Sequence, residues 1–229
     1  MGYPISLCIL FAHHRNDTVT RHHLQMLRAN NAYPIVPLCN GTAESIADAV
    51  DVSPFAAEFA GENKWWGSDA TIYCWFRHCR SVEAERYAVI EWDTLATMPL
   101  EEYYAEVWDA DAAAAEIKTP ASDPNWEWFR LHGGRLPQDL RPFAAGLVPF
   151  NGTLLSHRAM EKVCGMQIPH NINNELRLGT LLRAGGFALR TMPPAKAATN
   201  NWRADLITVG DTPGVYHPVK TILGSAIKG

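Results

Sequence analysis

Two carboxylates stand one residue apart at the end of an apolar run, Tyr87-Ala-Val-Ile-Glu-Trp-Asp93. If residues 87–90 form a buried strand, the alternation of side chains turns Glu91 and Asp93 to one side and Trp92 to the other. Oxygen ligands at the carboxyl end of a strand suit a divalent cation that carries phosphate. The alternative for such a pair is a solvated loop or a helix N-cap, so the rest of the chain must decide between them.

Polar residues also follow the first apolar run, residues 5–12, in His13-His-Arg-Asn-Asp17. In a sheet of parallel strands, the carboxyl end of a strand faces the binding crevice. We therefore expect His13, Arg15 and Asn16 to contact a diphosphate or a nucleobase. The histidine pairs do not indicate zinc, since two adjacent histidines cannot easily face one point.

Glu175 opens a strong helical pattern, residues 174–184, which Gly185 and Gly186 end. A carboxylate at the start of a helix can face a pocket and act as a general base. The helix N-terminus is expected to lower its pKa, which weakens a base. The alternative is a first-turn glutamate that only the helix dipole favours.

The elements that must position these residues alternate between strand and helix. Residues 5–12, 18–30 and 33–38 are typical of a strand, a helix and a strand, a βαβ unit whose crossover implies parallel pairing. Ser68 or Asp69 is predicted to cap a helix with Ile72, Trp75 and Phe76 inward. Further predicted strands are 87–90, 146–150 and 187–191, and further predicted helices are 100–108, 157–164 and 174–184. Residues 109–115 continue a helix or form a loop, 121–142 form an irregular excursion that covers a site, and 193–229 are largely loop.

Length and composition favour one folded domain with a substantial core. The 229 residues are 47% hydrophobic and carry a net charge of -4, which disfavours nonspecific nucleic-acid binding. Five cysteines without a C-x-x-C pair predict reduced thiols in a cytoplasmic protein. No apolar run reaches the ~18 residues that a transmembrane helix needs, so any membrane contact is expected to be peripheral.

The order of these pieces resembles the GT-A-type glycosyltransferases, the nucleotide-diphospho-sugar transferases, over most of the chain. In that superfamily a Rossmann-like βαβ half holds the nucleotide, and a later strand ends in an acidic D-x-D-like triplet. Glu91-Trp92-Asp93 is similar to the triplet in an E-x-D form. Residues 65–76 followed by 90–93 also look like a group of uncharacterised bacterial glycosyltransferase-like proteins.

This resemblance implies an α/β, single-domain, Rossmann-like GT-A fold with a mostly parallel central sheet flanked by helices. Residues 1–93 would form the nucleotide-binding half, and residues 94–229 the acceptor half with a metal-completing C-terminal segment. The implied substrates are a nucleotide-sugar donor and a carbohydrate or other acceptor.

The resemblance also implies roles for single residues. Asp93 is expected to bind Mn²⁺ or Mg²⁺ directly, Glu91 directly or through water, and the late His217 to complete the metal shell. Glu175 would be the catalytic base of an inverting enzyme. Nucleotide or diphosphate contacts are expected from Asp69, Trp92 and Lys220 in addition to His13, Arg15 and Asn16, and stacking on sugar or base from among Trp65, Trp66, Trp126 and Trp128.

Two other functions remain open on sequence alone. The same acidic pair and histidine could serve a metal-dependent phosphoryl-transfer or hydrolytic enzyme, although the further acidic ligands of a two-metal site are missing. The chain could also be a nucleotide- or carbohydrate-binding protein without catalysis, since fold does not imply activity.

Overall fold

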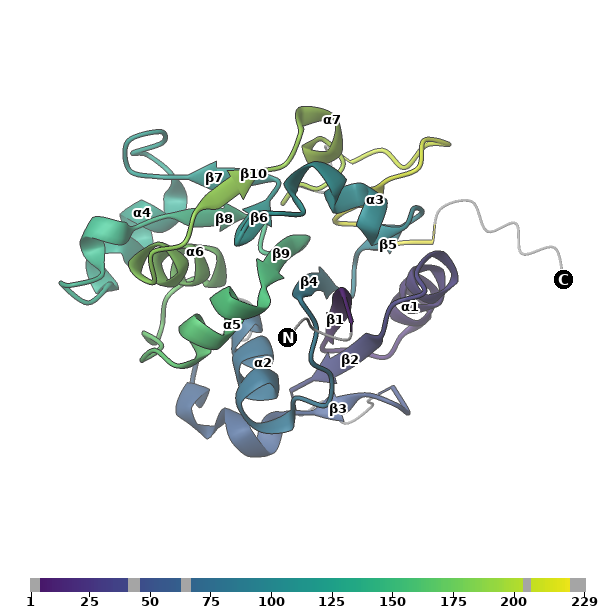
Figure 1. The fold of residues 1–229 in the computed structure, drawn as a ribbon, viewed down its shortest axis with the longest axis horizontal. Coiled ribbons are helices and arrows are strands. Elements are labelled where there is room, and N and C mark those ends of the chain that lie inside the picture. The colour runs from purple at the N-terminus through teal and green to yellow at the C-terminus, as the bar shows by residue number, and fades with distance from the viewer. Residues whose placement is uncertain (1–4, 41–45, 63–66, 204–206, 223–229) are drawn as a thin grey trace, which may run out of the picture.

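A seven-stranded sheet lies at the centre of the computed structural model, which describes residues 5–40, 46–62, 67–203 and 207–222 (Figure 1). Trp65 and Trp66 lie outside the described residues. The strand order is β10-β6-β9-β4-β1-β2-β3. The strands of this sheet are β1 (Leu7–His13), β2 (Ile35–Cys39), β3 (Val50–Asp51), β4 (Arg86–Glu91), β6 (Ala112–Ala114), β9 (Thr153–Ser156) and β10 (Leu189–Thr191).

Most neighbouring strands in this sheet are parallel. β1 pairs in parallel with β2 and β4, β2 with β3, and β6 with β10, whereas β9 runs antiparallel to both β4 and β6. The buried β1 and β4 occupy the middle of the sheet. The predicted α/β class, with a mostly parallel, Rossmann-like sheet flanked by helices, is therefore confirmed.

Helices cover both faces of the sheet (Figure 1). One apolar core lies on the face that carries α2, α5 and α6, and a second lies on the face that carries α1 and α3. The helices are α1 (Thr18–Asn30), α2 (Ser68–Cys74), α3 (Leu100–Tyr104), α4 (Glu127–His132), α5 (His157–Cys164), α6 (Asn174–Ala184) and α7 (Pro194–Ala197). No helix in the described ranges is long and apolar enough to span a bilayer.

Local sequence signals explain the helices that were predicted with the right bounds. Asp17 caps α1 by accepting from the Thr20 N–H at 2.9 Å, and Ser156 caps α5 by accepting from the Ala159 N–H. Asn173 does the same for α6, which ends at Gly185. These caps satisfy amides that the first helical turn leaves without partners.

Strands β6 and β9 of the central sheet, like the two-residue β3, were not predicted as strands. Residues 109–115 were expected to extend a helix or form a loop, but Ala112–Ala114 form β6. Tertiary burial overrides the helix preference of alanine here, because all three side chains are fully buried. The four-residue β9 follows an Asn151-Gly152 turn and was not predicted.

Two small sheets stand beside the central one. β7 (Glu116–Lys118) pairs with β8 (Gly146–Val148), the strand predicted over 146–150. β5 (Leu95–Ala96) pairs antiparallel with β11 (Val215–Tyr216). The second pair joins the segment after β4 to the C-terminal segment, which was expected to be largely loop.

The expected irregular excursion, residues 121–142, contains a helix. It holds α4 together with two 3₁₀ turns, Gly133–Arg135 and Arg141–Phe143. Trp126, Trp128 and Phe129 pack against a small apolar cluster that includes Ile172 and Leu176. The excursion therefore covers the beginning of α6.

Candidate functional site

Three possible ligand side chains converge at the carboxyl end of β4. One ligand atom each from Glu91, Asp93 and His217 lies within 4.8 Å of the others, and among the described residues this is the group that could hold a metal ion. The His217 Nε2 atom is 3.4 Å from Asp93 Oδ1 and 3.8 Å from Glu91 Oε2. Two carboxylates and an imidazole are suitable ligands for Mn²⁺ or Mg²⁺, with the nitrogen favouring Mn²⁺.

Backbone pairing explains why residues so far apart in the chain meet. In the β5–β11 pair, Tyr216 lies opposite Leu95, so His217 follows directly on one strand while Asp93 precedes the other. The Val219 N–H also donates to the Asp93 carbonyl at 2.7 Å. The late histidine is thus fixed beside the acidic pair by main-chain hydrogen bonds.

The orientation of the His217 ring follows from its second nitrogen. Nδ1 lies 2.7 Å from the carbonyl oxygen of Asn201, which can only accept, so Nδ1 carries the hydrogen of the neutral ring. In the neutral ring the Nε2 lone pair therefore lies beside Asp93 and Glu91, whereas in the protonated ring Nε2 donates to Asp93. A metal-binding histidine is commonly oriented by such a bond to a backbone carbonyl.

Burial and mutual charge set the protonation of the three groups. Burial raises the pKa of Glu91 to about 7, with His217 opposing and Asp93 reinforcing that rise. Burial acts to raise the pKa of Asp93, but the hydrogen bond and charge of His217 outweigh it and leave the pKa lowered. Burial acts to lower the pKa of His217, but Asp93 and Glu91 outweigh it and leave the pKa raised. Asp93 is therefore the permanent anion of the group.

The alternation expected for the triplet is present. Trp92 turns to the α1 face, where it packs in the second core, lies 4.6 Å from the Arg15 guanidinium and meets His14 edge-on. Its carbonyl oxygen accepts from His23 Nδ1 at 3.0 Å. Trp92 therefore joins the loop after β4 to the loop after β1 and to α1.

The residues predicted after β1 lie on the same edge of the sheet. His13 pairs in register with Cys39, and Ala12 with Glu91, so the carboxyl ends of β1, β2 and β4 are adjacent. His13 is buried, and its Nε2 atom has no hydrogen-bond partner in the described part of the chain. Arg15 is half exposed and pairs with Asp17 at 3.2 Å, and Asn16 accepts from Arg21.

Glu175 is buried at the start of α6, only 9% exposed. Its Oε2 atom accepts from the indole N–H of Trp128 at 3.1 Å, and the Phe150 backbone supplies another hydrogen bond. The charges of Glu91 and His217 both act on it, so Glu175 lies within electrostatic range of two of the three possible ligands.

The pKa of Glu175 runs against the sequence expectation. A helix N-terminus was expected to lower it, but burial dominates and raises the pKa of Glu175 to about 8, with Glu91 adding to the rise. The hydrogen bonds from Phe150 and Trp128 only moderate the effect. A carboxylate with this pKa is a stronger base than an exposed one.

Asp69 does not cap α2, contrary to that part of the prediction. The N-cap is Gly67, and no side chain in the described ranges caps this helix. Both Asp69 oxygens accept instead from the fully buried Arg177, Oδ2 from its Nε at 2.8 Å and Oδ1 from its Nη2. Arg177 also binds Glu62 and the Pro169 carbonyl. Asp69 thus ties α2 to α6.

The hydroxyl of Ser68 links two helices to the acidic pair. It hydrogen-bonds the Glu91 carboxylate and accepts from Asn174 Nδ2 at 2.6 Å. The remaining predicted phosphate contact, Lys220, lies farther out. Its side chain is 61% exposed, and its Nζ is 4.0 Å from Asp93 Oδ2.

Sequence reasoning missed Asn151 as a supporting residue. Its Oδ1 accepts from the Glu91 N–H and the Thr94 hydroxyl, both at 2.8 Å, and its amide exchanges hydrogen bonds with Asn200. Gly152 has a φ of 73°, and Asn200 leaves no room there for a Cβ. The Asn-Gly pair is the signal that could have located this turn.

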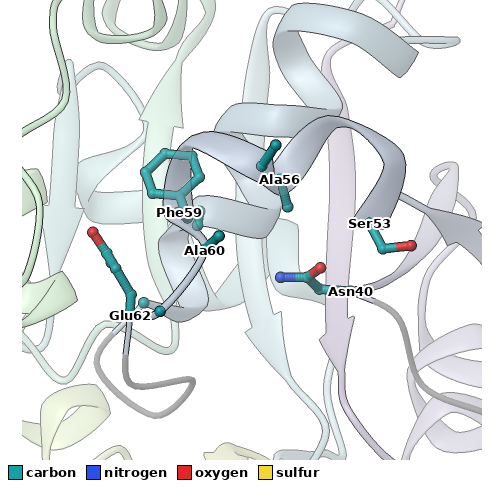
Figure 2. A pocket seen from close by; sticks show the side chains of 10 residues that line it. Asn40, Ser53, Ala56, Phe59, Ala60 and Glu62 are labelled. Carbon is teal, nitrogen blue, oxygen red and sulfur yellow. The ribbon is translucent and has the colours of Figure 1, made fainter.

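A pocket of about 360 Å³ lies beside the carboxyl end of β2 (Figure 2). Asn40, which directly follows β2, and Ser53 stand on one side of it, with Phe59 and Glu62 on the other (Figure 2). Gly67, the neighbour of Ser68, also lines it. The pocket therefore adjoins the segment that contacts Glu91.

Comparisons with known proteins add little to this geometry. No family model matches the chain, and no curated protein matches its sequence. Among solved structures, the chain is similar to the apo form of mouse xyloside xylosyltransferase 1, with 12% identity and a TM-score of 0.41, over 82% of this chain and 84% of that chain. The function must therefore be inferred from the site residues.

Proposed function

We propose that the chain is a metal-dependent glycosyltransferase of GT-A type, which moves a sugar from a nucleotide-diphosphate sugar to an acceptor hydroxyl. The observation that carries this proposal is the meeting of Glu91, Asp93 and His217 at the carboxyl end of β4, with the buried Glu175 within their electrostatic reach. One cation site beside one separate base suits such a transfer when it proceeds with inversion at the sugar carbon.

Asp93 and His217 would hold the ion, with Glu91 as the third ligand. His217 is suited to this because its Nε2 lone pair already lies beside both carboxylates. A bound Mn²⁺ or Mg²⁺ supplies neutralising charge to a diphosphate leaving group. Lys220, next to Asp93, is the protein cation that would meet the same phosphates.

The nucleoside end of the donor would lie along the carboxyl ends of β1 and β2. The pocket beside Asn40 supports this placement. Arg15 and Asn16 border the same edge of the sheet. The Arg15 guanidinium lies over the Trp92 ring, and this contact helps to hold it in place.

Glu175 would receive the proton of the acceptor hydroxyl. As the acceptor oxygen forms its bond to C1 of the sugar, its proton passes to the Glu175 carboxylate. The bond from C1 to the diphosphate oxygen breaks, and its electron pair leaves with the diphosphate. The raised pKa makes the ionised form of Glu175 a stronger base, and transfer is expected to increase as the pH rises toward 8 and the carboxyl loses its proton.

A transfer assay tests the proposal. The purified chain is incubated with a panel of nucleotide sugars and simple sugar acceptors, with Mn²⁺ or with EDTA, and products are followed by mass spectrometry. We expect metal-dependent formation of a glycosylated acceptor, lost in Glu175→Gln. Release of phosphate without sugar transfer would favour the hydrolytic alternative, and nucleotide binding without turnover would favour a silent binding protein.

A further inference from the structure

One side chain from the excursion over residues 121–142 touches the proposed base directly. The indole N–H of Trp128, on α4, donates to Glu175 Oε2 on α6 at 3.1 Å, across 47 positions of sequence. We propose that Trp128 is a positioning residue that holds the Glu175 carboxylate in the orientation in which it accepts a proton. This inference rests on the proposed function, since it assigns the partner of the proposed base.

A second contact fixes α4 against the beginning of α6. The backbone N–H of Asn173, the α6 N-cap, donates to Nδ1 of the buried His132 at 2.7 Å. The His132 ring lies 5.3 Å from the Trp128 ring. The Trp128 indole is therefore packed against His132 of the same helix. Helices α4 and α6 meet at two hydrogen bonds, and the two α4 residues that form them lie one turn apart.

The start of α4 is fixed from the other side as well. Trp126 lies so close to β8 that a Cβ on Gly146 would be 2.2 Å from its ring. Phe129 packs edge-on against Trp126 with their ring centroids 4.8 Å apart. Because these contacts of Trp126 and Phe129 fix the start of α4, the Trp128 indole cannot easily move away from Glu175.

The chemistry of the indole suits an orienting role. An indole N–H only donates, so it stabilises the carboxylate without competing for the acceptor's proton. Trp128 is neutral, whereas the charged groups that act on Glu175 are Glu91 and His217. The charge states of Glu91 and His217 would change when metal and diphosphate bind. The hydrogen bond from Trp128 is independent of that change and fixes one oxygen of the base.

Nuclear magnetic resonance can test the contact without any substrate. In protein labelled with ¹⁵N at its tryptophans, the Trp128 indole cross-peak is assigned as the one missing in Trp128→Phe. We expect this peak to move with pH through the titration of Glu175, near pH 8, and to lose that response in Glu175→Gln. A Trp128 peak that ignores pH between 6 and 10, or responds equally in Glu175→Gln, would overturn the inference.

Kinetics then separate orientation from packing. Trp128→Phe keeps an aromatic ring but removes the N–H, and Phe129→Leu is a control that loses a similar packing contact on the same helix. We expect Trp128→Phe to lower kcat by ~10-fold or more with the KM for the nucleotide sugar changed less than ~2-fold, because a hydrogen bond to a charged group is lost. Equal losses of kcat in Trp128→Phe and Phe129→Leu would contradict orientation as the cause.

The two proposals fail in different ways. A wild-type chain without transfer activity, but with an indole peak that follows Glu175, would refute the glycosyltransferase and with it the catalytic role of this contact. An active wild type whose indole peak does not respond to Glu175 would refute the positioning role alone.

Discussion

His217 Nε2 lies 3.4 Å from Asp93 Oδ1, although 124 positions separate the two residues in the chain. The Asn201 carbonyl holds the other ring nitrogen, and the β5–β11 pairing holds the backbone on both sides. The acidic pair after β4 is therefore joined to a histidine with a defined lone pair. An acidic pair in a solvated loop would have no such partner.

The three proposed ligands should not contribute equally to metal binding. We expect Asp93→Asn and His217→Gln each to weaken Mn²⁺ binding in the presence of a nucleoside diphosphate by ~100-fold or more, since loss of even a supporting residue around a metal costs 10–100-fold. Glu91→Gln should cost less, because Glu91 is partly protonated near pH 7. Electron paramagnetic resonance of free Mn²⁺ measures these affinities. Glu161→Gln, on the exposed face of α5, is the control that should bind as the wild type.

The pKa of Glu175 predicts a pH-dependent stability. The folded carboxyl holds its proton up to about pH 8, whereas the unfolded one loses it near 4.5, so the folded state binds more protons between these values. The contribution of Glu175 to stability is therefore fully present below pH 4.5 and is lost as the pH rises toward 8. Glu175→Gln, which cannot ionise, should raise the Tm of the metal-free protein at pH 9 by roughly 3 °C or more, and much less at pH 5. A Tm gain of the same size at both pH values would contradict ionisation as the cause.

Local patterns predicted much of the fold. The bounds of α1, α5 and α6 agree with the sequence because each has a side-chain cap, and β1 and β4 are continuous apolar runs. The strand Ala112–Ala114 was not predicted because alanine favours helices, and the neighbouring strands β9 and β10 that pair with it are distant in the sequence.

The candidate site was predictable only in part. The acidic pair, the late histidine and the helix-start glutamate are visible as sequence motifs. The contact between Trp128 and Glu175 is not, since nothing local to either residue indicates the other. The pKa of Glu175 was predicted in the wrong direction because burial, which arises only in the folded chain, outweighs the hydrogen bonds from Phe150 and Trp128 that lower it.

Removal of the buried guanidinium of Arg177 should destabilise the fold strongly. Arg177 is fully buried and forms ion pairs with the carboxylates of Asp69 and Glu62. We expect Arg177→Met to lower the free energy of unfolding by about 3–5 kcal/mol, because buried charges lose their partner. Urea unfolding measures the change. Arg190→Ala breaks an exposed pair with Asp109 and should cost no more than ~1 kcal/mol. Similar losses for both variants would show that burial is not what matters.

Gly179 allows α6 to lie close to the segment before β8. A Cβ at this position would be 2.4 Å from the Ala145 carbonyl oxygen, a backbone atom that cannot swing aside. Gly179→Ala is therefore expected to destabilise the chain by about 1–3 kcal/mol in urea unfolding, since overpacking forces backbone shifts. Gly133→Ala places a methyl group in open space and should be close to neutral. The prediction fails if Gly179→Ala unfolds at the same urea concentration as the wild type.

The central claim is that Glu91, Asp93 and His217 form a cation site that holds a nucleoside diphosphate. Isothermal titration of UDP and of GDP into the wild type and into Asp93→Asn, each with Mn²⁺ and with EDTA, tests it most directly. We predict that at least one of the two nucleotides binds the wild type with Mn²⁺ at least ~10-fold more tightly than with EDTA, a coupling of about 1.4 kcal/mol, and that Asp93→Asn abolishes this difference. Equal binding of both nucleotides to the wild type with and without Mn²⁺ would contradict the claim.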